Sequence, residues 1–226
     1  MYNLEMKFNT IWMVFVVILT SCAPLPSGEL PDCPEVMIQP EQGQQAPHAT
    51  DAELLPTICV PEPIVAPTLP AVIPENLALD EATGLHMTGK PQVFDLEDYR
   101  LRVYGKVANE LNLAYDELRC MPKVTDTPWL NCPGAFVDKA EWSGVPLDYV
   151  LDLAGIGEEA TELWLTSGTG YKALVKLGDA LEKGSFLAYE LEGKTLPFIH
   201  GFPVRVVFPY EFGSKWVKWL VEIEVK

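Results

Sequence analysis

Apolar and polar residues alternate along residues 99–107, which read Tyr-Arg-Leu-Arg-Val-Tyr-Gly-Lys-Val. This period of two predicts a strand with one exposed face. Short apolar or alternating runs predict four further strands, at residues 163–166, 186–190, 204–208 and 216–225.

Three short segments show helical features instead. Residues 146–154 repeat apolar side chains at helical spacing and stop before Gly155, which predicts a helix of two to three turns. Shorter helices are expected at 113–118 and 176–181. Because strands outnumber these brief helices and glycine or proline turns separate the elements, the sequence predicts a β-rich α+β domain and no doubly wound sheet.

Proline and charge are unevenly distributed over the 226 residues. The chain has 16 basic and 32 acidic residues and a formal net charge of −16. Such an acidic surface repels the phosphate backbone of DNA and RNA, so nucleic-acid binding is not an expected function. Residues 22–90 contain 12 of the 20 prolines, ten acidic residues, one lysine and no aromatic residue. Such a segment cannot bury enough apolar area to order itself, so we expect a largely disordered tether, followed by a folded domain at 91–226.

The N-terminus has the pattern of an export signal. Residues 11–19 form a nine-residue apolar run after Lys7, too short for a span of about 20 residues but typical of a signal peptide at residues 1–21. The run ends in Leu-Thr-Ser-Cys, which resembles a bacterial lipobox with Cys22 as the acylated residue. The sequence thus predicts a lipoprotein of the bacterial cell envelope, held outside the cytoplasm on a lipid membrane. The alternative is a short buried helix followed by an ordinary loop cysteine.

Export would place the cysteines in an oxidising compartment. Cys33 and Cys59 could then form a disulfide in the tether, although their spacing does not establish it. Cys132 lies in a turn-forming Asn-Cys-Pro-Gly loop. One soft thiolate suits a high-valent transition metal with oxo ligands better than zinc, which takes three or four protein ligands. The alternatives are a half-buried structural thiol or a disulfide between Cys132 and Cys120.

Four cationic side chains cluster in this acidic domain. They fall within nineteen residues and are His200, Arg205, Lys215 and Lys218. Together with nearby glycines they could form an anion site, since arginine offers a planar fork and lysine a point charge. Alternatively they are surface charges paired with acidic neighbours, Glu211, Glu222 and Glu224. The sequence has no glycine-rich phosphate loop, G-x-S-x-G elbow, H-E-x-x-H motif or paired C-x-x-C, and only three histidines.

Four stretches together resemble the molybdopterin-binding domain of the sulfite oxidase superfamily. They are Tyr-Arg-Leu-Arg-Val-Tyr-Gly at 99–105 with Leu-x-Tyr-Asp-Glu-Leu at 113–118; Cys132 with Trp-x-Gly-Val-Pro-Leu at 142–147; Leu-Ala-Tyr-Glu-x-x-Gly-x-x-Leu-Pro at 187–197; and His-Gly-Phe-Pro-Val-Arg at 200–205 with Val-Lys-Trp-Leu at 217–220. The resemblance covers about residues 91–225 and implies that family's fold, with mixed sheets and short helices.

The resemblance also implies a cofactor and its contacts. Cys132 corresponds to the molybdenum ligand, and His200, Arg205 and Lys218 to residues that hold the pterin and its phosphate. Lys215 stands where many members carry arginine and is a further candidate cofactor contact. In such proteins the cofactor supplies the redox chemistry, and the protein binds and orients it.

Some features depart from the family pattern. True sulfite oxidases place arginine shortly after the ligand cysteine, whereas residues 133–137 carry no charge, so sulfite is not the expected substrate. The dimerisation domain with its substrate-binding tyrosine does not follow, residues 84–92 contain no recognisable pterin contacts, and residues 1–10 contain no twin arginine. Two functions remain: a lipid-anchored molybdopterin oxidoreductase with an unidentified small substrate and a redox partner protein, or a cofactor-free module that binds an extracytoplasmic ligand or partner.

Overall fold

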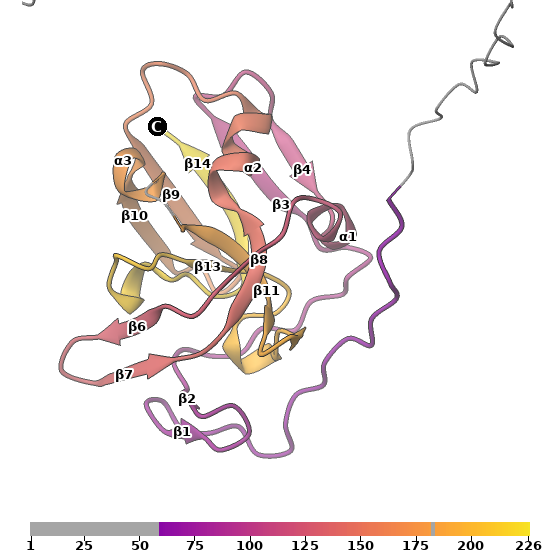
Figure 1. Cartoon of the computed structure of the whole chain (residues 1–226), viewed down its shortest axis with the longest axis vertical. Coiled ribbons are helices and arrows are strands. Elements are labelled where there is room, and N and C mark those ends of the chain that lie inside the picture. Colours follow the sequence, from indigo (N-terminus) through magenta and orange to yellow (C-terminus); the bar gives the residue numbers. More distant parts are fainter. Residues whose placement is uncertain (1–58, 182–183) are drawn as a thin grey trace, which may run out of the picture. The chain divides into compact units, whose positions relative to one another are not determined.

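The computed structural model describes residues 59–181 and 184–226 as short strands and helices joined by loops (Figure 1). The helices are α1 (Tyr115–Arg119), α2 (Leu147–Ala154) and α3 (Leu177–Ala180), with 3-10 turns η1 (Phe198–His200) and η2 (Gly213–Lys215). The strands are β1 (Leu79–Asp80), β2 (Leu85–His86), β3 (Leu101–Gly105), β4 (Leu111–Leu113), β5 (Val124–Asp126), β6 (Trp129–Cys132), β7 (Phe136–Lys139), β8 (Trp142–Pro146), β9 (Glu162–Ser167), β10 (Lys172–Lys176), β11 (Phe186–Leu191), β12 (Lys194–Thr195), β13 (Arg205–Val207) and β14 (Leu220–Val225).

Two five-stranded sheets and two hairpins make up the strands of this part of the chain. The first sheet has the order β10-β9-β14-β3-β4, in which β14 pairs parallel to β3 and antiparallel to β9. The second has the order β12-β11-β8-β5, with β13 also paired to β11. The hairpins are β1-β2 and β6-β7. The predicted fold class, β-rich with mixed sheets and short helices, is confirmed.

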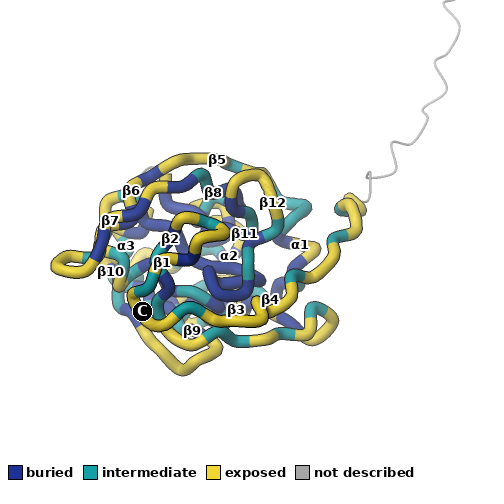
Figure 2. The backbone as a smooth tube through the Cα atoms, turned by 90° about the horizontal axis from the view of Figure 1, so that it is seen from below, coloured by how far each residue is buried: buried dark blue, intermediate teal, exposed yellow. Residues whose placement is uncertain are grey.

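The core forms where β8, β11 and α2 meet, and the buried segments appear dark blue in Figure 2. Strand β8 is buried along almost its whole length, and Trp142 is completely enclosed. A Cβ atom on Gly144 would overlap the backbone of Leu187, so glycine permits the close approach of β8 and β11. Helix α2 ends as predicted at Gly155, whose positive φ of 67° suits a residue without a side chain.

Two segments differ from the sequence prediction next to what becomes the functional site. The strand expected at 216–225 begins only at Leu220, because the preceding residues turn inward and the Trp216 indole donates to the Phe208 carbonyl. The loop expected around Cys132 is a hairpin instead, and Cys132 is the last residue of β6, opposite Phe136.

The folded part of the chain begins earlier than the predicted boundary at residue 91. Residues 77–90 form the β1-β2 hairpin and its flanks, and Leu85 and Met87 are buried. The two-residue strands pair with each other and are too short to show a periodicity, and the side chains that contact them lie far along the chain, so the composition of this segment did not indicate that it folds. The rest of the predicted tether up to residue 58, and the predicted signal peptide with Cys22, lie outside the described residues.

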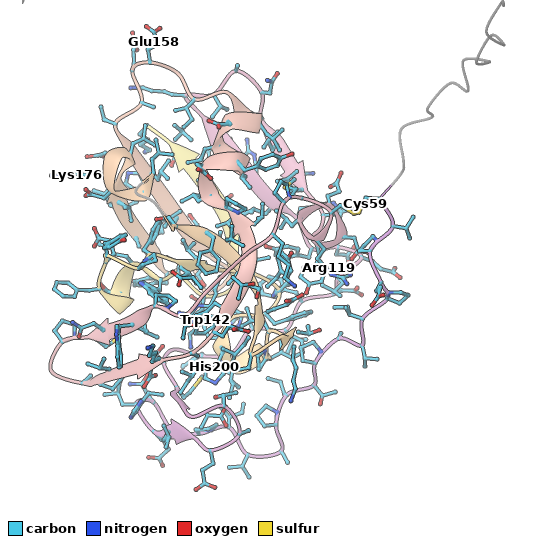
Figure 3. The ribbon with its side chains drawn as sticks, viewed as in Figure 1. Cys59, Arg119, Trp142, Glu158, Lys176 and His200 are labelled. Carbon is cyan, nitrogen blue, oxygen red and sulfur yellow. A yellow bond between two sulfur atoms is a disulfide. The ribbon has the colours of Figure 1, made fainter. Side chains whose placement is uncertain are left out.

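The pairing of Cys33 with Cys59, which the sequence left open, does not form, because Cys59 is bonded to Cys120 at the end of α1. The same bond excludes a pairing of Cys120 with Cys132. The segment that carries Cys59 runs beside α1, where the Arg119 guanidinium donates to the Glu62 carbonyl at 2.6 Å (Figure 3). Of the three cysteines in the described part of the chain, Cys132 is the one with a free thiol.

Candidate functional site

A cavity of about 510 Å³ lies among four segments of the domain. Its walls are the β6-β7 hairpin, residues 85–90, the turn between β9 and β10, and the stretch from η2 to the start of β14. Four of the five site residues predicted in the domain line this one cavity, namely Cys132, His200, Arg205 and Lys218. The structure thus brings together side chains from three separate parts of the sequence.

Cys132 presents a half-buried thiol to the cavity. The turn after β6 is closed by the Ala135 amide, which donates to the Cys132 carbonyl at 3.0 Å. A Cβ atom on Gly213 would overlap the Cys132 sulfur, so glycine at this position leaves the thiol its room. Burial raises the thiol pKa, the Asp138 carboxylate adds to this, and Arg205 and Lys218 oppose it. The thiol is consequently protonated at neutral pH unless a metal ion displaces the proton.

Arg205 extends a buried guanidinium from β13 into the same cavity, with 3% of the residue exposed. The guanidinium donates to the His200 carbonyl at 3.2 Å and the Trp216 carbonyl at 3.4 Å, and its Nε has no partner in the described part of the chain. Its Cζ lies 4.5 Å from the ring centroid of Trp142. Burial lowers the Arg205 pKa to about 9. Because no carboxylate among the described residues pairs with this cation, it is available to an anion.

Lys218 turns its ammonium group inward from the segment before β14. The Nζ atom donates to the Ile199 carbonyl at 3.0 Å and to the Thr88 carbonyl, and lies 4.6 Å from the Trp219 ring centroid. Burial lowers the Lys218 pKa well below its ordinary value, and the nearby Arg205 charge lowers it further. Within residues 59–181 and 184–226 this cation too has only carbonyl oxygens as hydrogen-bond acceptors nearby, apart from the Met87 sulfur.

His200 is almost completely buried at the end of η1, labelled in the lower half of Figure 3. Its Nε2 lies 3.0 Å from the Asp80 carboxylate and 2.8 Å from the Thr83 hydroxyl. Burial lowers the His200 pKa to about 4, despite the hydrogen bond to Asp80, and the charges of Lys218 and Arg205 act in the same direction. The ring is therefore neutral at pH 7, and the hydrogen-bond network assigns the Nε2 proton as the donor to Asp80.

Lys215 does not line this cavity, unlike the other predicted cationic residues. Its Nζ donates instead to the Leu174 carbonyl in β10, and neither residue belongs to the cavity lining. The backbone of the same turn still borders the cavity through Gly213 and Ser214. The structure therefore gives Lys215 a different environment from the one that the resemblance implied.

The sequence interpretation missed two walls of the cavity. Residues 84–92 contained no recognisable contact, yet five residues of this segment line the cavity: Leu85, His86, Thr88, Gly89 and Lys90. The turn between β9 and β10 adds polar residues, Ser167, Thr169 and Tyr171. No motif marks either segment, and their positions depend on pairing with distant residues.

A free thiol and two cations without carboxylate partners among the described residues line one cavity, and this combination suits an anion together with a soft metal ion. Comparison with known proteins identifies the protein family. The family model of the oxidoreductase molybdopterin binding domain matches residues 87–226, and the chain belongs to this family.

Two curated relatives and one solved structure illustrate the similarity. The chain is 30% identical over 226 residues to mitochondrial sulfite oxidase from Macaca fascicularis, with 85% of this chain and 42% of the relative covered. It is 32% identical over 142 residues to the uncharacterized oxidoreductase YuiH of Bacillus subtilis (strain 168), covering 62% and 71%. The sulfane dehydrogenase SoxCD from Paracoccus pantotrophus shares the fold, with a TM-score of 0.59, 23% identity, and 66% of this chain and 45% of that chain covered. The chain thus spans less than half the length of the sulfite oxidase that it matches.

The residues in the cavity suit a metal-pterin cofactor that carries phosphate. Among the described residues no three His, Cys, Asp or Glu side chains gather into a metal site, so a metal held here would have Cys132 as its one protein ligand. A single thiolate leaves the remaining coordination positions to non-protein ligands. The unpartnered Arg205 Nε and the inward-facing Lys218 ammonium are suited to phosphate oxygens.

Proposed function

We propose that this protein is a molybdopterin-dependent oxidoreductase. The observation that carries the proposal is the shared cavity of the Cys132 thiol, the Arg205 guanidinium and the Lys218 ammonium. When bound, the cofactor supplies two-electron redox chemistry coupled to oxygen-atom transfer. The protein would supply the Cys132 thiolate as metal ligand, the Arg205 and Lys218 cations that bind the phosphate, and a cavity that admits a small substrate.

The substrate in this proposal is a small molecule other than sulfite. The stretch after Cys132 carries no charge, and in the structure it forms the turn and start of β7, where Phe136 is buried. The cavity therefore lacks a cation from the position that true sulfite oxidases use for their oxyanion. Electrons would leave to a separate redox protein.

The proposal places the domain outside the cytoplasm of a bacterial cell, anchored by acylated Cys22. The apolar run at residues 11–19 and the cysteine that follows it support this location. The Cys59–Cys120 disulfide supports it independently, since such bonds persist mainly in oxidising compartments. No helix in the described residues is both long and apolar enough to cross a membrane.

The experiment is to produce the protein with its own N-terminus in a bacterium that makes the cofactor, and to measure molybdenum and pterin per chain. We expect close to one of each, and turnover of small oxo-acceptors with a one-electron dye, with sulfite among the poor substrates. Cys132→Ser is the matched variant, and a Cys22→Ser protein should lose membrane association. Wild-type protein without metal, made beside a loaded reference molybdoenzyme, would contradict the proposal.

A cofactor-free binding module is the second candidate function. The observation that favours it is the absence of a twin arginine in residues 1–10, because folded, cofactor-loaded proteins commonly leave the cytoplasm by the twin-arginine route. In that case the Arg205 and Lys218 site would bind a free anionic ligand. Protein that contains no molybdenum or pterin when made in a cofactor-producing bacterium, yet binds pyrophosphate in a calorimetric titration, would support this second function; protein that contains both would exclude it.

A further inference from the structure

We infer that His86 transfers protons to and from the reacting species in this cavity, and that Asp138 is the residue that positions it. The inference rests on the proposed oxidoreductase function and assigns a role that the cofactor-binding residues do not fill. It is carried by the contacts between β2 and β7, which lie side by side in Figure 1.

Asp138 holds His86 through both carboxylate oxygens. Its Oδ1 lies 2.7 Å from the His86 Nδ1, and its Oδ2 accepts the His86 backbone N–H at 2.7 Å. Only 3% of the Asp138 side chain is exposed. A buried carboxylate in this position fixes the proton of the neutral ring on Nδ1 and stabilises the ring when it becomes positively charged.

The ring has a second fixed contact. It stacks on Phe136 with a centroid separation of 4.5 Å and an interplanar angle of 9°. With Nδ1 bonded to Asp138 and one face on Phe136, the Nε2 atom has no hydrogen-bond partner among the described residues. The His86 side chain lines the cavity with Cys132 and is 29% exposed, so a proton on Nε2 can reach both the cavity and the solvent.

The other titratable groups around the cavity are less suited to this task. No Asp or Glu is among the described residues that line it. The Nε2 of His200 is already bonded to Asp80, and that ring is neutral because burial lowers its pKa to about 4. The Lys218 ammonium is bonded to carbonyl oxygens, and the Tyr171 hydroxyl donates to the Ser214 carbonyl at 2.7 Å. The remaining titratable residues that line the cavity are Lys90, Arg205 and Cys132, and the last two belong to the proposed cofactor site.

The proposed reaction needs such a residue for its proton balance. Oxidation of a small molecule with oxygen from water yields the oxygenated product, two protons and two electrons. The electrons pass one at a time to the external redox protein or dye. The protons must leave the cavity, and His86 accepts each at Nε2 and releases it to solvent before accepting the next. In the reductive direction the same atom delivers the two protons that form water.

The first test compares His86→Asn with wild type. The asparagine amide nitrogen takes the place of Nδ1 and retains the bond to Asp138, while Nε2 is lost. We expect unchanged molybdenum and pterin content and a fall in kcat/KM of about 10²- to 10⁴-fold, the usual effect of removing a general acid or base. The pH profile of kcat/KM should differ from that of the wild-type protein. Added imidazole should restore part of the activity to His86→Gly.

The second test needs no turnover. Nitrogen-15 NMR of histidine-labelled protein should show the neutral His86 ring with its proton on Nδ1, and Asp138→Asn should shift the proton toward Nε2. An Nε2–H ring in wild type, or a loaded His86→Asn protein with full activity and an unchanged pH profile, overturns the inference and leaves the oxidoreductase proposal standing. A metal-free wild type overturns the oxidoreductase proposal and the inference together.

Discussion

The domain has two cavities of similar volume and opposite chemistry. The cavity beside Cys132 measures about 510 Å³, and a second one, between β5, α2 and the start of β11, measures about 550 Å³. The first contains a thiol and inward-facing cations. Among the described residues, the second contains no cation, cysteine or histidine and is lined by three aspartates, Asp126, Asp148 and Asp152. Volume alone therefore does not identify the functional cavity.

The two cavities differ in how their charges are solvated. The three aspartates of the second cavity are exposed, so water satisfies them without a ligand. Arg205 in the first cavity is buried with weak carbonyl contacts and an unpartnered Nε. Burying a cation without a carboxylate partner costs free energy, and a bound anion offsets that cost. The difference indicates that the first cavity is built for a ligand, and four predictions test it.

The largest effect should come from the Cys132 thiol. Cys132→Ser removes the proposed metal ligand, and we expect redox activity to fall to the assay background and the electron paramagnetic resonance spectrum of the metal to change. Asp148→Asn in the second cavity should leave both unchanged. Cys120 is not an alternative ligand, because it is bonded to Cys59. An unaltered metal spectrum in Cys132→Ser would refute the ligand assignment.

The next effect concerns the Cys59–Cys120 disulfide. Its bond closes a loop with a sequence separation of 61 that includes the 85–90 wall of the first cavity and no residue that lines the second. Replacing both cysteines with serine should lower the free energy of unfolding by about 4 kcal/mol, the chain-entropy value for such a loop. Urea titration measures this, and hydrogen exchange should rise more at residues 80–90 than at 124–126. An equal rise in hydrogen exchange at both segments would contradict the expectation that the disulfide stabilises the first cavity more than the second.

Acid should weaken the fold through His200. Its pKa is 6.5 in the unfolded chain and about 4 in the folded protein, so between these values only the unfolded state binds the proton. The free energy of unfolding should therefore fall as pH drops from 6.5 to 4, by about 3 kcal/mol in total. Urea titrations at pH 7 and pH 4.5 measure the fall. His200→Phe should be less stable at pH 7 but less sensitive to this pH change, and an equal sensitivity would contradict the assignment.

The smallest effect is expected for the individual cations. Arg205→Ala or Lys218→Ala should each remove a charge-assisted contact to phosphate of about 1.5–3 kcal/mol, a tenfold to hundredfold loss of pterin occupancy under competition. Arg205→Lys keeps the charge and loses the planar fork, so it should retain intermediate occupancy. Lys215→Ala is the matched control, because its ammonium bonds to Leu174 outside the cavity. Full pterin content in both alanine variants would show that neither Arg205 nor Lys218 contributes to binding of the pterin phosphate.

Local periodicity predicted the elements whose packing is also local. Helix α2 and strand β3 repeat their apolar residues at regular spacing and formed close to the expected bounds. The first cavity was predicted in part, since Cys132, Arg205 and Lys218 belong to stretches with a family resemblance. Lys215 belongs to the same stretch, yet the turn at η2 directs its side chain elsewhere.

The rest of the first cavity depends on contacts between residues far apart in the sequence, which no local pattern indicates. Asp80 and His200 are 120 positions apart, and His86 and Asp138 are 52 apart. The strands that carry Asp80 and His86 have two residues each and lie in a segment whose composition is typical of a tether. Their order comes from partners in the domain, as does the Cys59–Cys120 bond, so composition alone assigned them to the wrong region.

The place of β14 within the first sheet has a consequence for synthesis. Because β14 lies between β3 and β9, residues 101–105 and 162–167 lack their central neighbour until the ribosome has made residues 220–225. Lys218 and Trp219, which border the cavity, immediately precede that strand. Pairing across so long a stretch of chain is slow, since the loop must close before the contacts form. The cavity is consequently completed after translation of this segment, and a ligand that binds it can do so only then.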